Sequence, residues 1–131
     1  MSLPAADIGC EPQDLLRTFP ELRLLVLYGS RGRGDAHAGS DWDFAYVADA
    51  GLDEPGLRLA LVNAVASDHV DLVDLERAGA VLRYGAARDA RLLVEREAGE
   101  LERFRLAAIR FWLEIEPILS ESHAAVLERL G

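Results

Sequence analysis

Residues 29–43 read GSRGRGDAHAGSDWD, and the interpretation of the whole chain begins from this stretch. Gly29-Ser30 interrupts the apolar run of residues 22–28, and ten residues later Asp41 opens a second run that continues to Val47. Glycine permits the sharp turn that such an interruption needs. We therefore predict a strand over 22–28, a glycine- and arginine-rich turn with a short helix, and a second strand over 41–47.

The two aspartates at the start of the second run form a pair. Residues i and i+2 of a strand point to the same face, so Asp41 and Asp43 present two carboxylates side by side. Such a pair repels itself unless a cation lies between its members, and oxygen ligands of this kind suit Mg²⁺, which commonly binds one or two carboxylates plus substrate phosphates. Gly29 allows a phosphate to approach the backbone closely, and the helix expected to begin here offers N–H groups that bind phosphate. Ser30 adds a hydroxyl donor. The stretch therefore predicts a site for a metal ion and a nucleotide.

A third carboxylate is expected from the segment Val70-Asp71-Leu72-Val73-Asp74, within a predicted strand over 69–75. Its two aspartates are three residues apart and point to opposite faces of a strand, so only one can join the first pair. We choose Asp71, because Asp74 lies near the strand end, where solvent exposure explains an aspartate. The third carboxylate could activate an acceptor while metal ions bridge the attacking and leaving oxygens.

The basic residues limit the chemistry further. All 14 are arginines, so neither a P-loop lysine nor a lysyl-nucleotide intermediate is available. Arg31 and Arg33 could contact a triphosphate through their guanidinium groups, although arginines in a glycine-rich loop are equally often ordinary surface residues.

The remaining sequence alternates between helical and strand patterns, without repeats or linkers. We expect helices over 12–19, 55–67 and 78–86 and an edge strand over 92–94. Apolar residues recur at helical spacing from Leu101 to Leu119, which predicts an amphipathic helix kinked or ended near Pro117. At 131 residues the chain fits one α/β (α+β) domain, 1–131, with its motif region over 22–75 and a C-terminal helical region over 97–128.

Composition excludes several classes of function. The net charge of −9 argues against broad nucleic-acid binding, which depends on many phosphate contacts from basic residues. No apolar stretch approaches the roughly 18 residues that a membrane span requires, so we expect no membrane association. The single cysteine, Cys10, cannot form an internal disulfide, and a cytoplasmic location is the default expectation.

Together, Gly29-Ser30, the spacing to Asp41-x-Asp43 and the later Val70–Val73 strand resemble the polymerase-beta-type nucleotidyltransferases. The short length narrows the resemblance to the minimal nucleotidyltransferase group, over roughly residues 20–119. The further features that carry it are Arg31-x-Arg33-Gly34, Ser40-Asp41, Leu82-Arg83, Arg91-Leu92-Leu93 and the final helix. Trp42 and Phe44 depart from the small aliphatic residues that are commoner in the family, which bears on packing and not on the carboxylates.

The resemblance implies a small mixed sheet flanked by helices, with a long C-terminal helix. It implies an enzyme that uses ATP as substrate and Mg²⁺ as cofactor, often the antitoxin partner of a HEPN ribonuclease toxin to which it attaches AMP on a tyrosine. Carried onto this chain, the catalytic and metal-binding residues would be Asp41, Asp43 and Asp71. The nucleotide-binding residues would be Gly29, Ser30, Arg31, Arg33 and Ser40.

Three hypotheses follow in order of preference. The first is adenylylation of a HEPN-type toxin. The second keeps the chemistry with a small-molecule acceptor such as an aminoglycoside, for which so short a chain would need to form a homo-oligomer. The third is a non-catalytic antitoxin that neutralises its partner by covering it.

Overall fold

The computed structural model describes residues 11–35 and 39–130, with side chains described as far as residue 118. Cys10, and with it the expectation about disulfides, lies outside these residues. The helices are α1 (Pro12–Thr18), α2 (Gly29–Arg33), α3 (Glu54–Val65), α4 (Ala80–Asp89) and α5 (Glu100–Leu130). The strands are β1 (Leu22–Tyr28), β2 (Trp42–Ala48), β3 (Val70–Asp74) and β4 (Arg91–Glu95).

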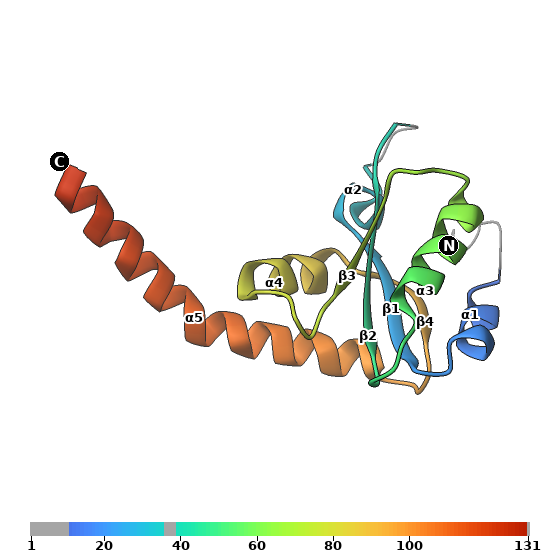
Figure 1. The fold of residues 1–131 in the computed structure, drawn as a ribbon. Coiled ribbons are helices and arrows are strands. Elements are labelled where there is room, and N and C mark those ends of the chain that lie inside the picture. Colours follow the sequence, from blue (N-terminus) through green and yellow to red (C-terminus); the bar gives the residue numbers. More distant parts are fainter. Residues whose placement is uncertain (1–10, 36–38, 131) are drawn as a thin grey trace.

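The strands form one mixed sheet in the order β3-β2-β1-β4 (Figure 1). β1 is antiparallel to both β2 and β4, whereas β2 and β3 are parallel. This arrangement confirms the predicted small mixed sheet with an edge strand near residues 92–94. The predicted strands differ from the observed ones by at most one residue at each end, as usual for such boundaries.

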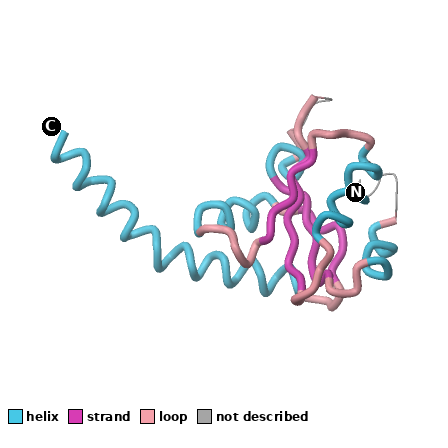
Figure 2. Tube along the Cα trace, viewed as in Figure 1, coloured by secondary structure: helices cyan, strands magenta, loops and turns pink. Residues whose placement is uncertain are grey.

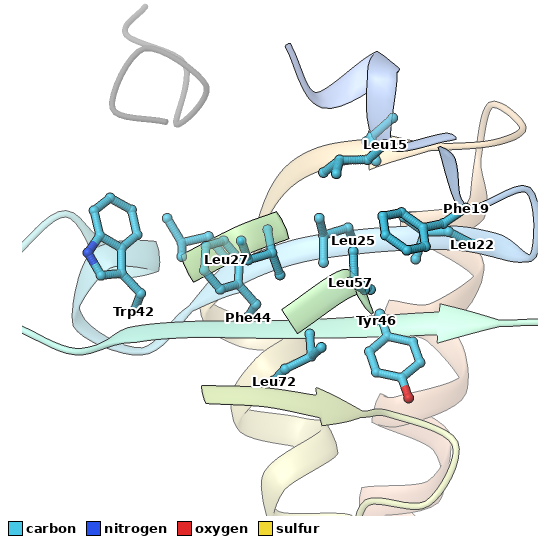
Figure 3. Close-up of a cluster of buried hydrophobic side chains, with 12 residues drawn as sticks. Leu15, Phe19, Leu22, Leu25, Leu27, Trp42, Phe44, Tyr46, Leu57 and Leu72 are labelled. Carbon is cyan, nitrogen blue, oxygen red and sulfur yellow. The ribbon is translucent and has the colours of Figure 1, made fainter. Parts of the chain in front are cut away.

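Each face of the sheet is covered by its own pair of helices, so the described chain has three layers (Figures 1 and 2). On one face α1 and α3 cover a cluster that includes Leu25, Leu27, Phe44 and Tyr46, shown in Figure 3. On the opposite face, sheet residues that alternate with the first set pack against α4 and α5. The sheet contributes Leu24, Val26, Ala45 and Val47, and the helices contribute Ala86, Phe104 and Ala108.

This alternation determines where the aspartates point. Asp43 lies two residues before Ala45 on β2, and Asp71 lies two residues before Val73 on β3. Both Ala45 and Val73 belong to the cluster beneath α4 and α5. The strand period of two therefore puts both carboxylates on the same side of the sheet as those helices.

The last helix is longer than the pattern of apolar residues predicted. Its start is fixed by Glu95, whose carboxylate accepts hydrogen bonds from the backbone N–H groups of Gly99 (3.3 Å) and Leu101 (3.1 Å). The helix continues through Pro117 to Leu130, so the alternative that it ends near Pro117 is wrong. At 1.5 Å per residue its 31 residues span about 46 Å, and Figure 1 shows it changing direction as it leaves the other elements.

Packing between α4 and α5 holds these two helices together on the carboxylate side. The ring of Tyr84 stacks on that of Trp112 with their centroids 4.8 Å apart, and such a pair adds about 0.5–1.5 kcal/mol beyond its buried area. None of the described helices combines the length and the apolar character needed to cross a lipid bilayer.

Candidate active site

Three side chains from neighbouring strands form a row at the end of the sheet where β1 passes into α2. Asp43 of β2 pairs in register with Asp71 of β3 on one side and with Tyr28 of β1 on the other. Directly opposed residues of adjacent strands point to the same face. The row Tyr28–Asp43–Asp71 therefore crosses three strands on the side of α4 and α5.

The electrostatics of this row follow from its crowding. Burial raises the pKa of Asp43 above its ordinary value, and the negative charges of Asp71 and Asp41 raise it further, whereas Arg33 lowers it. Burial also raises the pKa of the Tyr28 phenol to about 12, with added effects of Asp43 and Asp71. The site thus holds negative charge that its own residues do not fully compensate.

Asp41 is the residue immediately before β2. Its side chain is 70% exposed, and its Oδ1 is 3.6 Å from Nδ1 of His69, which is also exposed. Within the described ranges, no three His, Cys, Asp or Glu side chains are already gathered closely enough to hold a metal ion. The structure therefore brings Asp43 and Asp71 together, while Asp41 stands at the rim and acts on Asp43 through its charge.

Asp74, the alternative to Asp71, lies elsewhere. It pairs with Tyr46, and its Oδ1 accepts a hydrogen bond from the backbone N–H of Glu76 at 3.0 Å. Its side chain is only 26% exposed and contacts Arg77 at 3.6 Å. The expected explanation by solvent exposure is thus corrected: Asp74 stabilises the turn after β3, and Asp71 is the aspartate beside Asp43.

The turn at Gly29-Ser30 is pressed against the Asp43 carboxylate. Gly29 begins α2 immediately after β1, as predicted, and has a left-handed backbone with φ +66°. A Cβ at this position would lie 2.5 Å from Oδ2 of Asp43. Only glycine tolerates both the left-handed backbone and the short distance to the Asp43 carboxylate. Gly29 therefore lets the turn at Ser30 lie directly beside the carboxylate row.

The two predicted nucleotide-binding arginines lie in different surroundings. The guanidinium of Arg31 covers the ring of Trp42 at 3.7 Å, and its Nη2 donates to the carbonyl oxygen of Ser40 at 3.0 Å. Since Trp42 belongs to the α1 and α3 side, Arg31 faces away from the carboxylate row. Its observed contacts brace the loop before β2, and a nucleotide contact by Arg31 or Ser40 stays a prediction.

Arg33 is placed on the carboxylate side. Its Nε is 3.2 Å from Oδ2 of Asp35, and its Nη1 is 3.3 Å from Oδ2 of Asp89 at the end of α4. Its positive charge reaches Asp43, whose pKa it lowers. Of the two arginines, Arg33 is therefore the one positioned for an anion bound at the row.

A cavity of about 690 Å³ opens beside this row, between the start of α2 and α4. Its wall is mainly apolar, and among the described residues that line it Arg33 is the only one with positive charge. The lining residues are Tyr28, Gly29, Arg33, Gly79, Ala80, Val81, Leu82, Gly85, Ala86, Asp89 and Ile115. Its size is in the usual range for small-molecule and cofactor sites.

Sequence reasoning missed two functional candidates here. Tyr28 was not among the predicted site residues, although it lies two residues after Val26 in the same strand and therefore shares its face of the sheet. Asp89 carried no local signal, because its partner Arg33 lies 56 residues earlier in the chain. This arrangement can bind an anionic ligand between Arg33 and the Gly29 turn, directly beside the carboxylates of Asp43 and Asp71.

Comparison with known proteins places this geometry in context. The family model described as "Polymerase beta, Nucleotidyltransferase" matches residues 12–98. The protein adenylyltransferase MntA of Aphanizomenon flos-aquae is 32% identical over 117 residues, covering 79% of this chain and 77% of that protein. The MntA of Shewanella oneidensis is 44% identical over 72 residues, covering 52% of this chain and 51% of that protein.

Solved structures are similar over more of the chain. A toxin-antitoxin structure with AMP-PNP matches with a TM-score of 0.72 at 28% identity, covering 98% of this chain and all of the matched one. The tri-AMPylated Shewanella oneidensis HEPN toxin in complex with its MNT antitoxin matches with a TM-score of 0.65 at 28% identity, covering 91% and 92%.

Proposed function

This chain belongs to the polymerase beta nucleotidyltransferase family, together with the protein adenylyltransferases MntA, and we propose on that basis that it transfers AMP from ATP to a HEPN-type partner toxin. The observation that carries the proposal is the pairing of Asp43 with Asp71 against the Gly29 turn. A similar structure contains AMP-PNP, and another contains an AMPylated HEPN toxin, which supports both the nucleotide and the acceptor.

The proposed reaction is a direct displacement at the α-phosphorus of ATP. The phenol oxygen of an acceptor tyrosine forms the new O–P bond, the bond between the α-phosphorus and its bridging oxygen breaks, and pyrophosphate leaves with that electron pair. Asp71, at the exposed end of the row, is the proposed acceptor of the phenol proton. Because the chain has no lysine, the transfer has no lysyl intermediate.

Mg²⁺ is the proposed cofactor, held by Asp43 and Asp71 with Asp41 completing the set. The donor chemistry fits, since these are oxygen ligands, and a cation would offset the burial and the negative charges of Asp71 and Asp41 that raise the pKa of Asp43. Asp41 is exposed, so its side chain can turn towards the pair at little cost. When bound, the cation would neutralise charge on the phosphates and on the leaving group.

Nucleotide contacts are proposed for the residues on the same side of the sheet. Gly29 gives the phosphates close access to the backbone, the Ser30 hydroxyl can donate to them, and Arg33 supplies the positive charge of the cavity wall. The cavity between α2 and α4 would hold the remainder of the nucleotide.

The test is transfer of label from ATP carrying a radioactive α-phosphate to a HEPN-type toxin, a small helical protein with an Arg-x4-His motif. We expect labelled toxin with the wild-type chain and Mg²⁺, and loss of label with Asp43→Asn or Asp71→Asn. Asp74→Asn is the matched control, since it removes a carboxylate from the same strand and should leave transfer intact.

Two outcomes would contradict the proposal. Neutralisation of the toxin by the Asp43→Asn variant, without AMP on the toxin, would show that binding alone suffices. Label on a free small molecule and none on a toxin would assign the chemistry to a different acceptor.

A further inference from the structure

The carboxylate of Asp89 lies at the last residue of α4, in the wall of the cavity beside the carboxylate row. Its side chain is only 8% exposed. Arg88 contacts both of its oxygens, with Nε at 3.0 Å and Nη2 at 3.2 Å, and Arg33 contacts Oδ2 at 3.3 Å. Two arginines thus share one nearly buried carboxylate, and the three groups together carry one net positive charge.

The second carboxylate that contacts Arg33, that of Asp35, is exposed to solvent. Asp35 is 62% exposed and contacts Arg33 at 3.2 Å from the loop that follows α2. An exposed ion pair of this kind contributes little free energy and is easily exchanged. A guanidinium group has five N–H donors, so Arg33 can keep Asp89 and accept an anionic ligand in place of Asp35.

The backbone holds α2 and α4 at a fixed separation. A Cβ at Gly32 would lie 2.5 Å from the carbonyl oxygen of Asp89 and 2.8 Å from that of Leu27. Arg91 also donates from Nε to the carbonyl oxygen of Gly32 at 2.7 Å. Asp89 therefore contacts Arg33 from a helix end that is packed tightly against α2.

We propose that Asp89 is a positioning residue for the nucleotide, whose carboxylate fixes the Arg33 guanidinium in the cavity wall so that it meets the triphosphate. This inference rests on the proposed function for the identity of the ligand. It adds a role that acts through Arg33, since Asp89 itself is anionic and would not bind phosphate. The pKa of Asp89 is lowered, chiefly by its hydrogen bond to Arg88 and also by Arg33, which agrees with a carboxylate that is ionised at neutral pH.

The experiment measures ATP affinity by calorimetry with Mg²⁺, and the KM for ATP and kcat of AMP transfer, in the full-length chain. The variants are Asp89→Asn, Arg33→Gln and the two combined, with Asp35→Asn as control. We expect each single variant to weaken ATP binding and raise KM about tenfold, as for loss of a charged hydrogen bond, with kcat within about twofold. The double variant should be no worse than Arg33→Gln, and Asp35→Asn should resemble the wild type.

The contrary results are distinct. A lowered kcat with unchanged KM, or losses that add in the double variant, would assign Asp89 a structural role and overturn the proposal. If Asp89→Asn does not fold, Arg33→Gln still tests the proposal, because an unchanged ATP affinity in Arg33→Gln would refute it. Wild-type protein that binds ATP but labels no toxin refutes only the proposed function, whereas wild-type protein that binds no ATP refutes both.

Discussion

Gly29 and Gly51 have the same kind of backbone in different surroundings, which makes them a matched pair. Both have positive φ angles, +66° and +96°, but a Cβ at Gly51 would contact nothing within 4 Å. We expect Gly51→Ala to cost about 1 kcal/mol of unfolding free energy and leave AMP transfer intact. Gly29→Ala should carry the same strain and, by displacing Asp43, lower kcat/KM about 100-fold.

The measurements are urea unfolding and the AMP-transfer assay on both variants. Equal activity in the two would show that the contact between Gly29 and the Asp43 carboxylate has no role in catalysis.

Asp89 gives a prediction about pH. Its pKa is lowered in the folded chain, first by the hydrogen bond from Arg88 and then by Arg33 from α2, so the unfolded chain binds a proton at Asp89 more readily. The stability it contributes is therefore present above its ordinary pKa of 3.8 and is lost as the pH falls through the lower folded value. Wild-type and Asp89→Asn unfolding free energies should differ at pH 7 and converge below about pH 4. A difference that is constant from pH 7 to 3 would contradict this.

At the scale of single residues, the sequence predicted what depends on alternation and missed what depends on contact. The strand period of two showed that only one of Asp71 and Asp74 could join Asp43, and the observed register pairs Asp71 with Asp43. Asp71 was chosen on the expectation that Asp74 is solvent-exposed, and that reason was wrong. Arg31 and Arg33 could not be separated in advance. They are two residues apart on a short helix, and only the packing of Arg31 on Trp42 distinguishes them.

Among the elements, α5 offers the clearest test of which face of a helix is buried. Ala108 is 1% exposed beneath the sheet, whereas Leu106, two residues earlier, is 55% exposed. We expect Ala108→Glu to lower the unfolding free energy by about 3 kcal/mol or more, because it buries an unpaired charge. Leu106→Glu should change it by no more than about 0.5 kcal/mol, since leucine and glutamate have similar helix propensities.

Chemical denaturation of the two variants decides this assignment. Similar losses of stability would mean that the two faces of α5 are not distinguished as described.

The strands were more predictable than the ends of the helices, for a physical reason. Gly29 and the residues after Val47 interrupt strands sharply, so β1 and β2 were placed within one residue. A proline near the end of an apolar pattern indicates a kink or an end equally well. Pro117 lies within the helix, which continues to Leu130, close to the end of the helical region predicted over 97–128. What the apolar pattern left open was whether Pro117 kinks this helix or ends it.

For the whole molecule, the net charge of −9 has a direct consequence for ligand binding. ATP adds negative charge to a site already crowded with carboxylates, so we expect it to stabilise the chain only together with Mg²⁺. With Mg²⁺–ATP at a concentration about 100-fold above its dissociation constant, the unfolding free energy should rise by about 2.7 kcal/mol. This corresponds to roughly 10 °C in Tm for a chain of this size.

A thermal-shift series with ATP, Mg²⁺ or both measures this effect. Asp43→Asn combined with Asp71→Asn should abolish the joint effect. An equal shift by ATP alone would argue against a cation at the carboxylates.

The overall architecture followed from the order of the predicted elements and from the family resemblance, whereas the cavity did not. Its wall combines Tyr28 of β1, Arg33 of α2, Ala80 of α4 and Ile115 of α5. These residues come together only when α4 and α5 pack on the sheet, which no local pattern encodes.

The position of Asp71 on β3 has one more consequence. β3 is the outermost strand of the sheet, and Asp71 is exposed there. A phosphorus atom held beside it would face bulk water until something covered it. A docked acceptor protein would cover this position and exclude water from the phosphorus atom. Without the acceptor, water could reach the bound ATP and hydrolyse it slowly.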